Sequence, residues 1–215
     1  HQAARLICGV VDATFTISAM TVAIELLHTL RRVWPAEVSR PYARLLFRCG
    51  GVAVHAGAED DALESYQAVL RICAALGPSA RLLHARAHNQ LSDFYRRLRR
   101  IDEAERHSTA ALALLPARPT APYEQYVRGN VVMRQGNLLK MRRRPEEALA
   151  LYEEAEALFA RLGALSSLSS VQQSTGHVLV QLGRKREARR FYERALKIDR
   201  ARGATLFELS LIHIS

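Results

Sequence analysis

Basic side chains gather in three short clusters along the 215-residue chain. A guanidinium group binds a carboxylate or a phosphate through paired hydrogen bonds, so each cluster could bind an anionic partner. The formal net charge of +10 is consistent with such a partner but does not identify one. The alternative is a solvated edge that only favours solubility. The clusters are Arg96, Arg97, Arg99 and Arg100, then Lys140, Arg142, Arg143 and Arg144, then Arg184, Lys185 and Arg186.

Catalytic and metal-binding patterns are missing from the sequence. It contains no GxxxxGK[ST], GxGxxG, HExxH or GxSxG motif, so we expect a non-catalytic chain without a cofactor. His84 and His88 share a helical face, but no third residue stands at a zinc-ligand spacing, so we expect no metal site. The cysteines, Cys8, Cys49 and Cys73, form no CxxC pair, which favours a reducing cytoplasm. Cys49 and Cys73 fall at apolar helix positions, which favours core packing over redox chemistry.

Neither end of the chain indicates a membrane or a secretory segment. The most apolar stretch, residues 10–30, is interrupted by Asp12 and Glu25, which argues against a membrane span. The chain begins at His1, and residues 209–215 (LSLIHIS) resemble a translated sequencing adapter, so we expect a fragment with a non-native tail. A short apolar tail or edge strand is the alternative for these seven residues.

A repeat appears when the chain is aligned on four alanines: Ala62, Ala104, Ala148 and Ala188. Their separations are 42, 44 and 40 residues (62 to 104, 104 to 148 and 148 to 188). Twelve residues before each alanine stands a small residue, four residues after it a tyrosine or serine, and fifteen after it a glycine or proline. The small residues are Gly50, Ser92, Gly136 and Gly176, and the closing residues are Gly77, Pro119, Gly163 and Gly203.

The physical interpretation of this repeat is a helical hairpin. Small residues let two helices approach where they cross, while apolar residues at i, i+3, i+4 and i+7 form the buried stripe of each helix. A closing glycine suits a left-handed helix cap. A single hairpin leaves an apolar face open, so successive hairpins must stack. The sequence therefore predicts an all-α, right-handed α–α superhelical solenoid of about five hairpins.

This pattern resembles the tetratricopeptide repeat, and the clearest match is Leu91-Ser92, Tyr95, Ala104, Ala111-Leu112 and Pro116. The early tryptophan of that family is absent from every repeat, the one tryptophan being Trp34. The longer period resembles the extended repeats of large bacterial transcriptional activators of the maltose-regulator type, and those of kinesin light chains. The resemblance implies a degenerate repeat over residues 1–42, four repeats over 43–203, and a truncated next helix plus tail over 204–215.

The hairpins predict alternating inner and outer helices. We expect inner helices at 4–16, 43–56, 83–98, 125–141 and 167–182. We expect outer helices at 19–33, 59–76, 102–115, 145–162 and 185–201. Acidic residues near the predicted starts of outer helices, among them Asp102 and Glu146, suit the positive end of the helix dipole.

In tetratricopeptide arrays the inner helices line a concave groove, and the register implies which residues would face it. Amide side chains can bond an extended peptide, and arginine can bind its carboxylates. Arg134 with Asn137 is similar to a carboxylate clamp, although the lysines of such a clamp are missing. The implied groove residues are Arg44, Arg48, Arg86, Asn89, Gln90, Asp93, Asn130, Arg134, Asn137, Gln173 and His177.

The three basic clusters fall at the turns inside consecutive hairpins and would form one basic ridge along an edge of the solenoid. We therefore expect a cytoplasmic scaffold or sensor module of a larger signalling or regulatory protein. Its partner would be a protein or peptide, including another domain of the same polypeptide, and not a membrane. A nucleic-acid-binding solenoid that uses the ridge is the less favoured alternative. A fragment of an enzyme whose active site lies outside the chain is the third.

Overall fold

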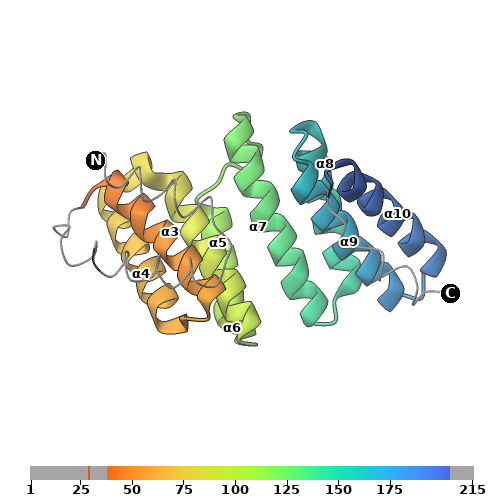
Figure 1. Ribbon diagram of the computed structural model, residues 1–215, viewed down its shortest axis with the longest axis horizontal. Helices are drawn as coiled ribbons and strands as arrows, with labels where there is room; N and C mark the ends of the chain where they lie inside the picture. The colour runs from red at the N-terminus through yellow and green to blue at the C-terminus, as the bar shows by residue number, and fades with distance from the viewer. Residues whose placement is uncertain (1–28, 30–37, 204–215) are drawn as a thin grey trace.

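The computed structural model describes Thr29 and residues 38–203, and all regular structure within them is helical. Four helical hairpins stack along the long axis of the molecule (Figure 1). The predicted helices at 4–16 and 19–33, and the predicted tail, lie outside the described residues. The hairpins are α3 (Arg40–Ala56) with α4 (Glu59–Leu76), α5 (Arg81–Arg97) with α6 (Ile101–Ala113), α7 (Pro122–Met141) with α8 (Pro145–Arg161), and α9 (Leu165–Gln181) with α10 (Lys185–Ala201).

Each of the eight helices predicted over the described residues is present, and every predicted boundary is within three residues of the observed one. A short 3-10 helix, η1 (Gly77–Ala80), joins the first two hairpins, and the proline-rich segment after α6 forms the connection to α7. Pro122 and Pro145 stand in the first turns of α7 and α8, where a missing backbone N–H costs nothing. The all-α solenoid predicted from the repeat is confirmed.

The recurring spacing of the repeat packs a tyrosine ring against a glycine in three of the four hairpins. The four repeat alanines are fully buried. A Cβ built on Gly50, Gly136 or Gly176 would stand 2.8, 2.6 or 2.7 Å from the ring of the tyrosine sixteen residues later. The prediction that the small residue lets two backbones approach is therefore refined, because the space is filled by a ring. In the second hairpin the same two positions hold Ser92 and Ser108.

The turn inside each hairpin uses a left-handed residue five positions before the repeat alanine. Glycine occupies this position twice, as Gly57 (φ 74°) and Gly183 (φ 74°). Arginine occupies it in the middle hairpins, as Arg99 (φ 60°) and Arg143 (φ 58°). These are the only non-glycine residues with positive φ in the described part of the chain. Two arginines of the predicted ridge therefore hold a conformation that costs a residue with a Cβ about 1–2 kcal/mol.

Ion pairs join the second hairpin to the third and the third to the fourth. Arg142, which follows α7, pairs with Asp102 and Glu105 of α6. Arg194 of α10 pairs with Glu156 of α8. Together with the buried apolar clusters, these contacts link the hairpins into a continuous stack.

Candidate functional site

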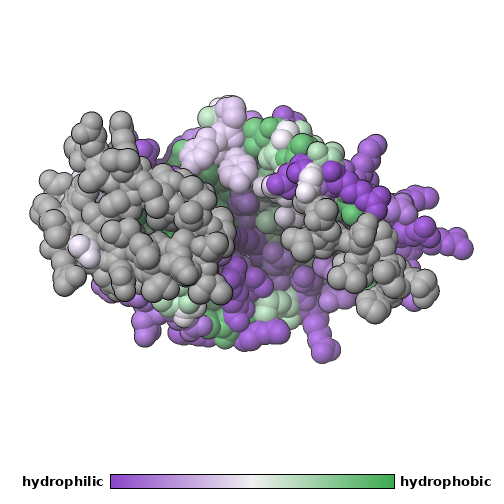
Figure 2. All heavy atoms as spheres, viewed as in Figure 1, coloured by the Kyte–Doolittle hydropathy of each residue, from purple (hydrophilic) through white to green (hydrophobic). Residues whose placement is uncertain are grey.

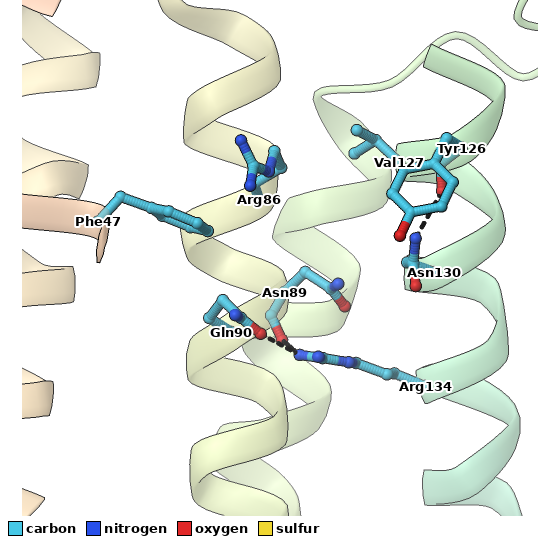
Figure 3. A pocket seen from close by; sticks show the side chains of 8 residues that line it. All are labelled: Phe47, Arg86, Asn89, Gln90, Tyr126, Val127, Asn130 and Arg134. Carbon is cyan, nitrogen blue, oxygen red and sulfur yellow. Dashed lines mark hydrogen bonds between the residues drawn. The ribbon is translucent and has the colours of Figure 1, made fainter. Parts of the chain in front are cut away.

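A pocket of about 160 Å³ opens between the inner helices α3, α5 and α7 (Figure 3). In the space-filling view the middle of the same face is hollowed, with hydrophilic residues in the hollow (Figure 2). The pocket combines aromatic, amide and guanidinium groups, which can form ring contacts and hydrogen bonds with a ligand. Its lining residues are Phe47, Arg86, Asn89, Gln90, Tyr126, Val127, Asn130 and Arg134.

The helical repeat explains why these side chains meet. On α5, Arg86, Asn89 and Gln90 stand three and four residues apart, so they share the helical face that lines the pocket. Ala85 and Ala87 of the same helix are fully buried. Phe47 of α3 packs edge-on against the buried Tyr66 ring, with the ring centroids 5.8 Å apart. The core of the first hairpin therefore fixes one wall of the pocket.

Arg134 ties α7 to α5 at the floor of the pocket (Figure 3). Its Nη1 donates to the Asn89 carbonyl oxygen at 2.7 Å and to Gln90 Oε1 at 2.6 Å. Burial lowers the pKa of the Arg134 guanidinium, and the negative charge of Asp93 opposes that shift. Hydrogen bonds to two neutral oxygens of α5 therefore fix the Arg134 guanidinium, which forms no ion pair with a described carboxylate.

The Asp93 carboxylate forms ion pairs with two arginines of its own helix. It accepts from Arg96 at 2.7 Å and from Arg97 at 3.0 Å. Burial raises the pKa of the Asp93 carboxyl, but Arg134, Arg96 and Arg97 outweigh burial and lower it. This carboxylate is therefore ionised at neutral pH and compensates several cations at once.

Arg86 lies between two aromatic rings. Its guanidinium carbon is 4.4 Å from the centroid of Phe47 and 5.9 Å from that of Tyr123. No carboxylate of the described residues forms an ion pair with it. Cation–π contacts use the faces of the guanidinium plane and leave its in-plane N–H donors available.

Asn89 lines the pocket, but its side-chain oxygen is buried. The residue is 7% exposed, and its Oδ1 has no hydrogen-bond partner. A buried amide oxygen without a donor costs about 1–3 kcal/mol of stability. Across the pocket, Asn130 Nδ2 donates to the Tyr126 carbonyl oxygen at 2.9 Å.

The other residues assigned to the groove lie outside this pocket. Asn137 accepts from the Tyr152 hydroxyl at 2.7 Å, and Gln173 donates to Ser169 and Asp199. His177 packs edge-on against Tyr192. Arg44 and Arg48 are exposed on α3. Five of the eleven predicted groove residues line the pocket: Arg86, Asn89, Gln90, Asn130 and Arg134.

Three lining residues, Phe47, Tyr126 and Val127, were missed by the sequence prediction, which considered only polar side chains. Phe47 could have been found, because it stands fifteen residues before Ala62, as Asn89 stands fifteen before Ala104. The repeat register therefore already placed Phe47 on the groove face.

The basic ridge is largely neutralised by carboxylates. Six of its eleven cations, namely Arg96, Arg97, Arg100, Arg142, Arg144 and Arg184, form ion pairs. No ion pair within the described part of the chain involves Arg99, Arg143, Lys185 or Arg186. Burial lowers the pKa of the half-buried Lys140. The charge available to an anionic partner is therefore smaller than the sequence suggests.

A third imidazole joins the two histidines that the sequence singled out. His84 stacks on His88, with ring centroids 5.0 Å apart, and Nδ1 of His88 lies 2.9 Å from Nδ1 of His107 on α6. The Tyr95 ring stacks on His107, and Arg100 lies over Tyr95. Among residues 38–203, no group of three or more histidine, cysteine or acidic side chains is arranged to hold a metal ion.

Comparison with known proteins assigns the architecture. Residues 129–201 match the tetratricopeptide repeat family, and they span the two C-terminal hairpins from α7 to α10. The fold is that of a tetratricopeptide repeat solenoid. No curated protein sequence gives a significant match. None of the helices in the described residues is both long and apolar enough to span a membrane.

Several solved structures share this tetratricopeptide fold at low sequence identity. BtubC (BKLC) from P. vanneervenii is 19% identical with a TM-score of 0.61, over 87% of this chain and 81% of that one. The repeats of a putative kinesin light chain from Podosopora anserina are 16% identical with a TM-score of 0.61, over 91% and 92%. Aspartyl phosphate phosphatase F from Bacillus subtilis is 14% identical with a TM-score of 0.69, over 88% of this chain and 46% of that one.

Proposed function

We propose that this tetratricopeptide solenoid is a non-catalytic scaffold that binds an extended segment of a partner protein in the pocket between α3, α5 and α7. The observation that carries the proposal is a pocket that combines the Arg86 guanidinium, which forms no ion pair with a described residue, with the amide side chains of Gln90 and Asn130. Amide and guanidinium groups can hydrogen-bond the backbone and the carboxylates of an extended peptide. Tyr123 and Tyr126, 48% and 41% exposed, add aromatic contact area at the rim.

Peptide retention by the immobilised protein tests this proposal. The probe is a degenerate heptapeptide library with acetylated and amidated ends. Asn130→Trp fills the pocket and is expected to abolish retention. Ala157→Trp, at an exposed position of α8, is the matched control and is expected to leave retention unchanged. Equal retention by both variants would contradict binding in this pocket.

The second candidate is nucleic-acid binding by the basic ridge, and the observation that favours it is the set of ridge cations without a carboxylate partner. Arg99 and Arg143 hold strained backbone at exposed turns, which fits a functional reason for arginine there. The paired state of the other arginines favours the peptide pocket. Labelled duplex DNA, added to the protein at physiological salt, distinguishes the two candidates.

The larger context proposed for the scaffold is a cytoplasmic signalling or regulatory protein of which this chain is one module. The support is the 40–44-residue period, which resembles the extended repeats of maltose-regulator-type activators. The partner segment would belong to another protein or to another domain of the same polypeptide. The neighbouring coding sequence tests this context, since an adjoining ATPase or helix-turn-helix domain would support it and a complete, unrelated reading frame would contradict it.

A further inference from the structure

The second hairpin lacks the tyrosine ring that packs against a glycine in the other three hairpins. Ser108 stands at the tyrosine position, and its buried Oγ has no hydrogen-bond partner among the described residues. Rings at other positions join the two helices instead. His88 of α5 contacts His107 of α6, with ring centroids 5.2 Å apart, and Tyr95 of α5 stacks on the same His107 ring at 5.3 Å. The imidazoles therefore form an aromatic link between α5 and α6.

Stacking partners hold the two linked imidazoles in place. The His84 ring stacks on His88 with the planes 25° apart, and the Tyr95 ring stacks on His107 with the planes 12° apart. His88 and His107 are both half-buried, and their Nδ1 atoms face each other at 2.9 Å. Two nitrogen atoms from different helices are therefore held close together before any ligand arrives.

Both imidazoles are neutral at pH 7. Burial lowers the pKa of His88 to about 4, aided by His107 and His84, and burial together with the Arg106 charge lowers the pKa of His107. A neutral imidazole is the form that binds a metal ion. In the hydrogen bond between the rings, one Nδ1 carries a proton. Moving that proton to Nε2 of the same ring leaves a lone pair on each Nδ1, so the pair can bind a cation without losing a proton.

The separation of the two nitrogens indicates which ions fit. Two metal–nitrogen bonds of about 2.0 Å place their nitrogens about 2.8 Å apart at a right angle and about 3.3 Å apart at the tetrahedral angle. The observed 2.9 Å is close to the right-angle value. Right angles between neighbouring ligands are characteristic of square-planar and tetragonal Cu²⁺ and Ni²⁺, whereas structural Zn²⁺ sites are tetrahedral.

From this geometry we infer that Nδ1 of His88 and Nδ1 of His107 bind one Cu²⁺ or Ni²⁺ ion as neighbouring ligands, with water in the remaining positions. The ion links α5 to α6 in the described hairpin that has no repeat tyrosine. It stabilises the fold, because the two nitrogens are brought together only when the hairpin has formed. The site does not depend on peptide binding. It departs from the expectation of no metal site, which rested on spacing along a single helix and therefore could not pair His88 with His107.

Titration calorimetry of the full chain with Ni²⁺ at neutral pH tests the site. Because the chain contains eight histidines, the quantity measured is the difference between variants. His88→Gln and His107→Gln are each expected to lose one equivalent of bound Ni²⁺. His84→Gln and His55→Gln are the controls and are expected to keep it, since His84 only stacks on His88 and His55 lies on α3. Far-UV circular dichroism confirms that each variant is folded, and either of the first two variants decides the result if the other does not fold.

Two further measurements test the geometry and its consequence. Electron paramagnetic resonance of the Cu²⁺-loaded protein is expected to show a tetragonal signal coupled to two imidazole nitrogens, and His107→Gln should lose it. At an ion concentration about a hundredfold above Kd, the melting temperature is expected to rise by about 5–10 °C, and it should not rise in His107→Gln.

The possible outcomes separate the site from ordinary binding to exposed histidines. Equal numbers of bound ions in the unsubstituted protein, His88→Gln and His107→Gln would overturn the site. An equivalent that is lost in His84→Gln but kept in His107→Gln would place the ion on one face of α5 and overturn the link between the helices. A melting temperature that does not change at saturating ion would overturn the stabilising role.

Discussion

Adding a single methyl group at Gly136 is expected to destabilise the third hairpin. A Cβ at this position would stand 2.6 Å from Tyr152 Cε1. The ring has little room to move, because Tyr152 is fully buried and its hydroxyl donates to Asn137 at 2.7 Å. Overfilling a packed site costs about 1–3 kcal/mol. Replacing a helical glycine by alanine returns about 0.5–1 kcal/mol. Gly136→Ala should therefore lower the free energy of unfolding by about 1–2 kcal/mol.

Gly51 supplies the matched control for this substitution. It also lies within an inner helix, but a Cβ there would meet only the Tyr66 hydroxyl at 3.8 Å, an ordinary contact. Gly51→Ala should therefore raise the free energy of unfolding by about 0.5–1 kcal/mol. In a Tyr152→Ser background, which copies the serine of the second hairpin, Gly136→Ala should change sign and become stabilising.

Urea unfolding followed by far-UV circular dichroism measures all of these variants. Gly136→Ala could prove as stable as Gly51→Ala, or it could lower the free energy of unfolding equally in the Tyr152→Ser background. Either result would show that contact with the Tyr152 ring does not explain the glycine. The packing explanation of the repeat would then be wrong.

Three further predictions concern the turns, the imidazoles and the ridge. Arg143→Gly should raise the free energy of unfolding by about 1 kcal/mol, because glycine tolerates φ of 58° without a Cβ clash, whereas Arg144→Gly should not; urea unfolding measures both. Burial lowers the pKa of His88 to about 4, aided by His107 and His84, so the unfolded chain binds more protons than the folded one between pH 6.5 and about 4. Stability should therefore fall as pH drops through this range, and His88→Gln should flatten the dependence of the unfolding free energy on pH; an equally steep profile in the variant would contradict the assignment. Duplex DNA should bind weakly at low salt and not at physiological salt, as measured by fluorescence anisotropy, and tight binding lost in the triple Arg142, Arg143, Arg144→Ala variant would favour the ridge.

The hairpins could be predicted because their determinants are local and repeated. The alanine, the tyrosine four residues later and the glycine twelve residues earlier recur with one spacing, and that spacing follows directly from two helices packed side by side. The predicted helix boundaries lie close to the observed ones for the same reason, because prolines and glycines mark the starts and ends of helices. The left-handed arginines, Arg99 and Arg143, could not be predicted, because arginine has no preference for positive φ.

The candidate site was predicted only in part because its properties depend on contacts between hairpins. The register identified Arg86, Asn89 and Arg134 as groove residues. It could not show that Arg134 is engaged by α5 while Arg86 is held between aromatic rings. In the same way, the ridge arginine Arg142 pairs with Asp102, forty residues away on a neighbouring hairpin, so the charge of the ridge could not be judged from its composition.

The central claim is that the partner segment binds on the inner helices and not on the basic ridge. Backbone amide chemical shifts, recorded while the best-retained peptide is added, test it most directly. Binding in the pocket predicts that the shift changes cluster at Phe47, Asn89 and Asn130 and saturate together. Shift changes that cluster instead at the turns holding Arg99 and Arg143, with the three pocket amides unmoved, would contradict the claim.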